Sequence, residues 1–327
     1  LSGLVGSEMC IRDRDSRDVK KDNIFLAIKG KYNDGNKYIS KALSNDLPKK
    51  TEFKTRFHLL DTLVSILTGR LLPPGKKAFK FSKAQGGVKE STLLGSDVKV
   101  SAINAGFSNG MAAHANETDD STTEGRFHPG CAIVPATLAV AERENLSSKE
   151  IIKAIALGYD IGVRITTSLG YKTPKTSIFA THSIGPIFGC AASAGALLKL
   201  THEQCNYLLS YTVQQTSGLA CWNRDPDHIE KAFVFSGMTT RNAIYSALLA
   251  KENFTSVTDP LLGERGFHEG FAHNPNPKLI VEKLGENFKI DTASLKKWSV
   301  GSPIQSMMDA IESVSYTHLT LPTNREV

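Results

Sequence analysis

One stretch of the chain, residues 110–135, constrains its structure more than any other. It reads GMAAHANETDDSTTEGRFHPGCAIVP and lies between two apolar, alanine-rich segments, 100–113 and 132–141. Acidic groups this close repel one another, so a fold tolerates them only if they are solvated, bind a cation or hold raised pKa values suited to proton transfer. The stretch therefore predicts a solvated loop, a metal site or an acid–base site. The side chains in this stretch that are suited to chemistry include His114, Glu117, Asp119, Asp120, Ser121, Glu124, Arg126 and His128.

Size and composition favour a globular protein with a large core. The chain has 327 residues, of which 40% are hydrophobic, and a net charge of +6. Because the lysines and arginines are dispersed, no nucleic-acid partner is expected, whereas a small anionic substrate suits the excess of cations. No window has the apolar length of a membrane span, and the first residues lack the pattern of a signal peptide, so we expect no membrane partner and a cytoplasmic location. The 5 cysteines are scattered and show no pattern of a disulfide framework or a thiolate zinc site.

The periodicity of apolar residues predicts a mainly α-helical fold. In residues 52–67, large apolar residues recur three and four positions apart, which is typical of an amphipathic helix that ends at Gly69. Residues 73–75 (PPG) indicate a turn, and residues 91–94 and 98–100 a short hairpin. Ser147 and Glu150 form a capping box. Further helices are predicted over 36–47, 78–84, from 101 onward, and over 135–143, 147–165, 181–200, 203–216 and 231–250.

The sequence changes in texture after residue 260. We predict a large all-helical domain over residues 37–260, followed by the start of a smaller α+β lid domain over 261–313, with strands at 288–290 and 298–300. Residues 1–36 and 314–327 are interpreted as foreign or chimeric ends. The ends 1–14 and 314–327 show no periodicity, and residues 15–35 resemble part of the N-terminal module of Mur-type ligases, although no phosphate-binding loop follows.

Three other places carry side chains suited to chemistry. His182 opens a glycine-rich helix, where a histidine serves either as a hydrogen-bonding group or as a catalyst. Arg224 and Lys231 lie in a charged connection and suit carboxylate binding, or else form local surface ion pairs. Residues 299–309 (SVGSPIQSMMD) offer the neutral hydrogen-bonding groups of Ser302 and Gln305.

Residues 110–135 also contain the side chains of a possible metal site. His114, Asp119, Asp120 and His128 combine nitrogen and oxygen donors suited to a divalent cation. No HExxH or similarly tight spacing is present. The alternative is a solvated loop whose aspartates cap a helix. We favour acid–base catalysis over both and expect no metal.

Several ordered motifs resemble the MmgE/PrpD family over residues 38–312. They are HLLDTL at His58, AHANETDDS with HPG, LGYDIGVRI at Leu157, THSIGPIFGCAA at Thr181 and HIEKAFVFSGMTTRNA at His228. Members of this family include 2-methylcitrate dehydratase, cis-aconitate decarboxylase and iminodisuccinate epimerase. The resemblance implies a large helical domain with a smaller lid, a homodimer, and an active site between the two domains without a metal or organic cofactor.

The resemblance also implies roles for particular residues. The acidic loop of the family falls on Glu117, Asp119, Asp120 and Ser121, its two histidines on His128 and His182, and its lysine on Lys231. Glu117 departs from the family's aspartate by one methylene. The lid motif of the dehydratases and decarboxylases, K-P-Y-P followed by a histidine, is replaced by SVGSPIQ, which lacks both the cation and the imidazole.

These assignments predict a lyase of the 2-methylcitrate dehydratase type. His128 or His182 would act as base or acid, Lys231 and Arg224 would hold carboxylates, and the acidic loop would orient the imidazoles. Elimination of water or of CO2 and epimerisation all pass through a carbanion next to a carboxylate, so an epimerase of a related acid fits the same residues. A carboxylate-binding dimer without catalysis is also compatible with the sequence, as is a metal hydrolase centred on His114, Asp119 and His128.

Overall fold

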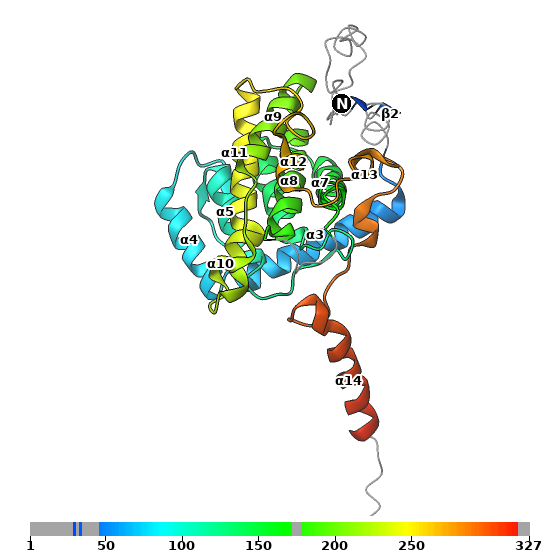
Figure 1. Cartoon of the computed structure of the whole chain (residues 1–327). Coiled ribbons are helices and arrows are strands. Elements are labelled where there is room, and N and C mark those ends of the chain that lie inside the picture. The colour runs from blue at the N-terminus through cyan, green and yellow to red at the C-terminus, as the bar shows by residue number, and fades with distance from the viewer. Residues whose placement is uncertain (1–28, 31–32, 35–45, 172–177, 320–327) are drawn as a thin grey trace, which may run out of the picture.

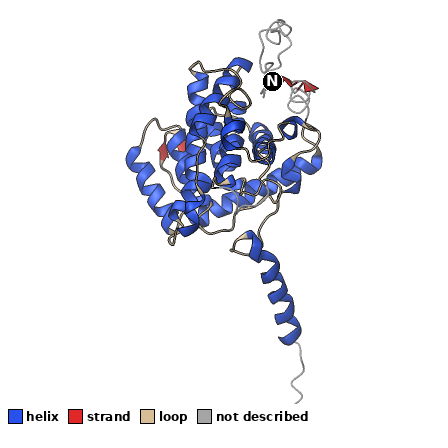
Figure 2. Cartoon of the chain, viewed as in Figure 1, coloured by secondary structure: helices blue, strands red, loops and turns tan. Residues whose placement is uncertain are grey.

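The computed structural model describes residues 29–30, 33–34, 46–171 and 178–319. In these ranges the fold is mainly α-helical, as predicted, and its strands are short antiparallel pairs (Figures 1 and 2). Most of the segment interpreted as foreign at the N-terminus, most of the helix predicted over 36–47, and the tail from residue 320 lie outside the described residues. None of the described helices is long and apolar enough to cross a membrane.

Most of the long helices lie close to predicted ranges, whereas the helix over Gln305–Leu319 was not predicted and extends into the segment interpreted as a foreign tail. The long helices are α3 (Lys49–Gly69), α4 (Pro73–Gln85), α5 (Ala102–Ala113), α6 (Gly130–Arg143), α7 (Ser148–Ser168), α8 (Thr181–Leu197), α9 (His202–Gln215), α11 (Met238–Lys251) and α14 (Gln305–Leu319). The short helical segments are η2 (Ala220–Arg224), α10 (Ile229–Ala232), the π-helical η3 (Phe233–Gly237), α12 (Phe267–Phe271), α13 (Lys278–Val281), η4 (Lys289–Thr292) and η5 (Ser302–Ile304). The strand pairs are β1 (Lys29–Gly30) with β2 (Asn33–Asp34), and β3 (Ser91–Thr92) with β4 (Lys99–Val100).

Helices α7 and α8 form the centre of the core and pack closely because glycines face each other. A Cβ atom on Gly162 would lie 2.7 Å from the carbonyl oxygen of Gly185, and one on Gly158 would lie 2.9 Å from that of Gly189. Side chains at these positions would force the helices apart. The abundance of glycine and alanine in residues 181–200 therefore serves close helix packing, as the sequence indicated.

The starts of two helices show how local sequence acts. Ser147 and Glu150 form the predicted capping box at the start of α7. By contrast, Pro73 and Pro74 do not form a separate turn, because α4 begins at Pro73. Proline is well tolerated in a first helical turn, where its missing N–H would have no helical partner anyway.

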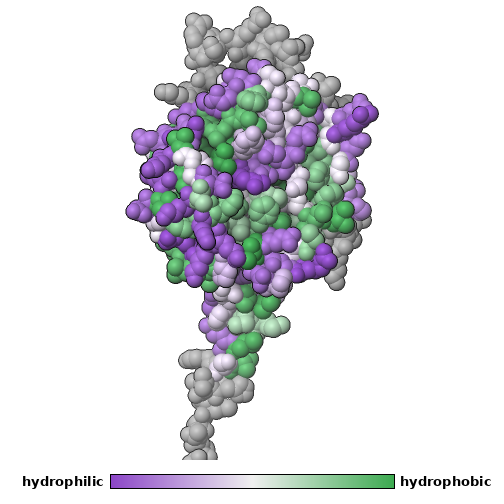
Figure 3. All heavy atoms as spheres, turned by 90° about the vertical axis from the view of Figure 1, so that its left-hand side faces the viewer, coloured by the Kyte–Doolittle hydropathy of each residue, from purple (hydrophilic) through white to green (hydrophobic). Residues whose placement is uncertain are grey.

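Helix α3 presents its apolar stripe outward. Phe53, Leu60 and Leu67 are 62%, 60% and 50% exposed. The buried face of α3 is instead largely polar and includes Thr55, His58, Thr62 and Ser65. The predicted helix is confirmed, but the side that enters the protein is the one carrying hydroxyl and imidazole groups. On the face of the molecule beside α4, apolar side chains also lie among polar ones (Figure 3).

The segment after residue 260 packs onto α7 and contributes buried residues to the same core, including Leu261, Phe267 and Ile290. Helix α14 projects away from this body (Figure 1). The strands predicted at 288–290 and 298–300 are wrong, since η4 and a series of bends occupy these positions. At 288–290 the reason lies in α7, where the Arg164 guanidinium donates to the carbonyl oxygens of Glu282 and Asn287, and Asp160 accepts from the Lys289 backbone N–H at 3.1 Å. At 298–300 the side chain of Gln305 bonds the backbone groups of Trp298 and Val300.

Candidate active site

The loop between α5 and α6 is held in a compact shape by backbone contacts. It begins at His114, the C-cap of α5, and ends where α6 starts at Gly130. Thr122 pairs with Phe127 inside the loop, and Ser121 pairs with Ser294 through two 2.9 Å backbone hydrogen bonds. The second bridge fixes the segment after η4 against the loop.

Asp120 anchors this loop in the interior. Its Oδ1 accepts from the Gly130 backbone N–H at 2.8 Å, and its Oδ2 accepts from the hydroxyl of Tyr159 at 2.6 Å. The same Oδ2 lies 2.6 Å from Nδ1 of His58 on the buried face of α3. Because Asp120, His58 and Tyr159 are all at most 1% exposed, this group positions the loop and is shielded from solvent.

His128 is held as a neutral base. Its Nδ1 lies 2.6 Å from the carbonyl oxygen of Asp120, which can only accept, so Nδ1 carries the proton and Nε2 carries the lone pair. Burial lowers the pKa of His128 to about 4, although nearby Asp119 opposes the shift. The ring is therefore uncharged at neutral pH, and Nε2 is ready to accept a proton.

His114 and Asp119 form a second buried pair. Nδ1 of His114 lies 2.7 Å from Oδ2 of Asp119, and both side chains are 0% exposed. Burial raises the pKa of Asp119, but His114, His128 and Lys296 outweigh burial and hold this pKa well below its usual range. Burial lowers the pKa of His114. Nε2 of His114 is buried and has no hydrogen-bond partner among the described residues.

Four imidazole rings follow one another through the site. The ring centroids of His228 and His114 are 5.1 Å apart, those of His114 and His128 are 5.3 Å apart, and those of His128 and His182 are 5.8 Å apart. Phe235, from the π-helical segment η3, stacks on His114 and His182 at 4.4 and 4.3 Å. Burial lowers the pKa of His182 well below its usual value, with a further contribution from His128.

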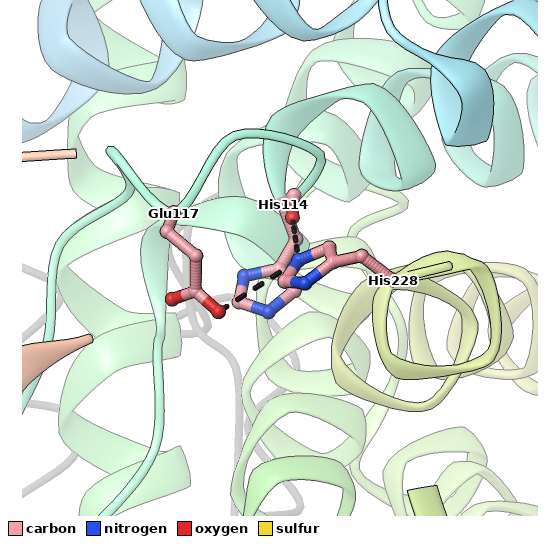
Figure 4. A group of neighbouring side chains, drawn as sticks. All are labelled: His114, Glu117 and His228. Atoms are coloured by element: carbon pink, nitrogen blue, oxygen red, sulfur yellow. Dashed lines mark hydrogen bonds and ion pairs between the residues drawn. The ribbon is translucent and has the colours of Figure 1, made fainter. Parts of the chain in front are cut away.

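Two lysines join this row of imidazoles through Glu117. Lys231 forms an ion pair with Oε1 of Glu117, and Nζ of Lys296 lies 3.3 Å from Oε2 of Glu117 and 3.3 Å from Oδ1 of Asp119. The side chain of Lys296 is 1% exposed and that of Lys231 is 22% exposed. Burial raises the pKa of Glu117, but His114 and the two lysines outweigh it and bring it to about 2. Figure 4 shows the Glu117 carboxylate directed toward the stacked rings of His114 and His228.

Among the residues that the structure describes, two groups have donor atoms close enough to hold a metal ion. They are His114, Glu117 and His228, and His114, Asp119 and Cys131. In the first group both oxygens of Glu117 are engaged by ammonium groups. In the second group, burial raises the pKa of the Cys131 thiol well above its usual value, and the thiol donates to the carbonyl oxygen of His128. The ammonium groups beside Glu117 repel a cation and so disfavour the first group as a metal site.

The structure brings most of the predicted site residues together, namely Glu117, Asp119, Asp120, His128, His182 and Lys231. Ser121 enters the arrangement through its backbone bridge to Ser294. Arg224 is exposed on η2, and within the described residues no polar contact joins it to the cluster. The side-chain amide of Gln305 is engaged by backbone groups of Lys297, Trp298 and Val300, so it stabilises a local turn. Ser302 lies on η5, beside that turn.

Sequence reasoning missed several residues of the site. Lys296 supplies a buried cation shortly before SVGSPIQ, where the sequence suggests that a cation is lacking. His58 and Tyr159 occur inside the motifs HLLDTL and LGYDIGVRI, but the sequence assigns a role to neither. Phe235 occurs inside the motif HIEKAFVFSGMTTRNA, and the sequence assigns it no role either. The lysine could have been suspected from its place beside the altered motif, whereas its burial depends on how the chain returns to the loop.

The fold and the site define a class of mainly helical protein with a buried cluster of imidazole, carboxylate and ammonium groups. Residues 36–280 match the MmgE/PrpD N-terminal domain. The chain therefore belongs to the MmgE/PrpD family. It is 25% identical over 266 residues to cis-aconitate decarboxylase of Homo sapiens, an alignment that covers 78% of this chain and 53% of that protein. The chain thus spans about half the length of this relative.

Proposed function

We propose that this protein is a lyase that eliminates water or CO2 from a small di- or tricarboxylic acid, in the manner of a 2-methylcitrate dehydratase. The observation that carries the proposal is the neutral His128 ring, with a lone pair at Nε2, in the same cluster as the ammonium groups of Lys231 and Lys296. A neutral base beside cations is what removal of a proton next to a carboxylate requires. The name of the human relative, a decarboxylase acting on a tricarboxylic acid, supports the same chemistry.

In the dehydration reaction, Nε2 of His128 takes the proton from the carbon next to a substrate carboxylate. The electron pair left on that carbon delocalises into the carboxylate, and the ammonium of Lys231 stabilises the added negative charge. Expulsion of hydroxide forms the double bond, and a proton delivered through His182 completes the water molecule. In the decarboxylation reaction, CO2 leaves with its bonding electrons staying on carbon, and that carbon takes up a proton from solvent through His128 or His182.

The remaining residues of the cluster orient these groups. Asp119 fixes the tautomer of His114 and neutralises Lys296, while Asp120 sets the direction of His128 through its carbonyl oxygen. No step in this scheme requires a metal or an organic cofactor.

The test is an assay with a panel of di- and tricarboxylates, in which new double bonds are followed by ultraviolet absorbance and released CO2 is measured separately. We expect turnover of at least one hydroxy acid or unsaturated acid, and a loss of about 10²–10⁴-fold in kcat for His128→Ala, the range of general acid–base catalysis. Carboxylate binding that persists in His128→Ala and Lys231→Ala, without turnover of any acid by the parent protein, would instead support a binding protein.

A further inference from the structure

The two lysines of the site are held very differently. Nζ of Lys296 contacts three acceptors on the loop, the carbonyl oxygen of Glu117 at 2.8 Å, its Oε2 at 3.3 Å and Oδ1 of Asp119 at 3.3 Å. Within the described residues, the ammonium of Lys231 has one acceptor, Oε1 of Glu117. Lys296 is buried, whereas Lys231 is 22% exposed at its side chain. Lys231 is therefore the ammonium that a ligand can approach.

Glu117 is placed to occupy Lys231 in the absence of a ligand. It has a left-handed backbone conformation, with φ of 58°, and its carboxylate bridges both ammonium groups. The rings of Trp222 and Phe235 flank the ammonium of Lys231, with centroids 5.6 and 5.3 Å from Nζ. The only acceptor supplied to Lys231 among the described residues is thus a carboxylate from the protein itself, bound as a ligand carboxylate would be.

We infer that Glu117 is a built-in competitor, which occupies Lys231 until the carboxylate of a ligand displaces it. Release of Oε1 leaves Glu117 attached to Lys296 through Oε2, and the backbone contact to Lys296 holds the loop in place. The exchange replaces the ion pair between Glu117 and Lys231 by one between the ligand and Lys231. The affinity for the ligand therefore depends on how well its carboxylate competes with Glu117. The inference rests on the proposed function, because it identifies which ammonium receives a carboxylate of the substrate. It makes Glu117 a determinant of affinity.

The experiment measures binding without turnover. The probe is tricarballylate, a tricarboxylate without a hydroxyl group to eliminate, and the readout is isothermal titration calorimetry at low ionic strength. Glu117→Gln keeps the size of the side chain but removes its charge, and we expect it to bind tricarballylate about tenfold more tightly than the parent protein, a change of about 1.4 kcal/mol. Glu117→Asp, which is shorter by one methylene, is expected to give a smaller gain and serves if the amide variant fails to fold.

Two further variants locate the effect. Lys231→Met should weaken binding, and the gain from Glu117→Gln should disappear in that background, because the two groups are then coupled. Glu124→Gln is the matched control, since Glu124 lies on the same loop but pairs with Lys289. Its affinity should equal that of the parent protein.

Two results would overturn the inference. One is tricarballylate affinity in Glu117→Gln that is no higher than in the parent, including no binding by either protein. The other is a gain that persists after Lys231→Met. Failure of the proposed function appears separately, as absence of turnover in the acid panel, and does not affect this comparison of affinities.

Discussion

Nζ of Lys296 lies 3.3 Å from Oδ1 of Asp119, although 177 residues separate the two along the chain. This contact brings a cation from the segment after η4 to the buried carboxylate of Asp119. Breaking it should affect both stability and activity, because Asp119 would then keep its charge in the interior with one partner fewer.

Replacing Lys296 with methionine should therefore lower the free energy of unfolding by about 3 kcal/mol, the cost of breaking a buried ion pair, and should abolish most turnover. Denaturant unfolding and the acid panel measure these effects. Lys297→Met is the control, since the side chain of Lys297 is 55% exposed. It should change stability by less than about 0.5 kcal/mol. Equal effects of the two variants would contradict a special role for Lys296.

The loss of activity on the acid side of the pH–rate profile should occur at an unusually low pH. An ordinary histidine loses its proton near pH 6.5, but burial lowers the pKa of His128 to about 4. If His128 is the base, kcat/KM should remain high as the pH falls from neutral and should decline only near pH 4. Circular dichroism at each pH checks that the protein remains folded. A decline centred near pH 6.5 in a folded protein would assign the base to another group.

The hydroxyl of Tyr159 should matter for stability more than for the chemical step. Tyr159→Phe removes one donor to Asp120 inside the protein, and we expect a loss of about 1–2 kcal/mol in the free energy of unfolding. Because His58 and Gly130 still hold Asp120, kcat should fall much less than in His128→Ala. Tyr211→Phe is a control, because its hydroxyl donates to the carbonyl oxygen of Thr255 near the surface. A kcat loss as large as that of His128→Ala would show that Tyr159 takes part in proton transfer.

Asp61 on α3 should destabilise the protein at neutral pH. Burial raises its pKa to about 7, with further contributions from Asp120 and Asp119, and its buried Oδ2 has no hydrogen-bond partner among the described residues. The folded state therefore binds a proton more strongly than the unfolded state, and stability is lost as the pH rises from about 4 to about 7. Asp61→Asn should stabilise the protein by about 2 kcal/mol at pH 8 and by much less at pH 4.

Thermal or denaturant unfolding at pH 4 and pH 8 tests whether Asp61→Asn stabilises the protein more at the higher pH. Asp97→Asn, which changes an exposed carboxylate, should show no such difference between pH 4 and pH 8. A stabilisation by Asp61→Asn that is the same at both pH values would rule out the ionisation of Asp61 as its cause.

Activity should survive removal of metal ions. Both oxygens of Glu117 are paired with lysines, which disfavours a cation between His114, Glu117 and His228. Protein treated with a chelator and then shown by metal analysis to be free of transition metals should keep its full kcat. Loss of turnover that zinc or another divalent ion restores would support a metal enzyme instead.

Much of the fold could be predicted from local patterns, since α7 follows from its capping box, and α8 and α9 lie close to the predicted ranges 181–200 and 203–216. The orientation of α3 could not be predicted, because its apolar stripe suggests the opposite buried face. The polar face of α3 is buried instead, where His58 bonds to Asp120. This contact joins distant parts of the chain, so the local pattern does not show it. The imidazoles and carboxylates of the site stood out as ionisable groups between apolar segments. Lys296 did not, because its importance arises only from the path that the chain takes back to the loop.

The position of Lys296 in the segment after η4 matters for the choice of domain boundaries when fragments of this protein are expressed. The match to the N-terminal domain ends at residue 280, yet the ammonium that neutralises Asp119 sits at position 296. A clone trimmed at the domain border would retain the glycine-packed helices and every imidazole of the row, but would have lost an internal counter-ion. Fragments designed by alignment alone would then lose buried core residues such as Ile290 together with the counter-ion of Asp119.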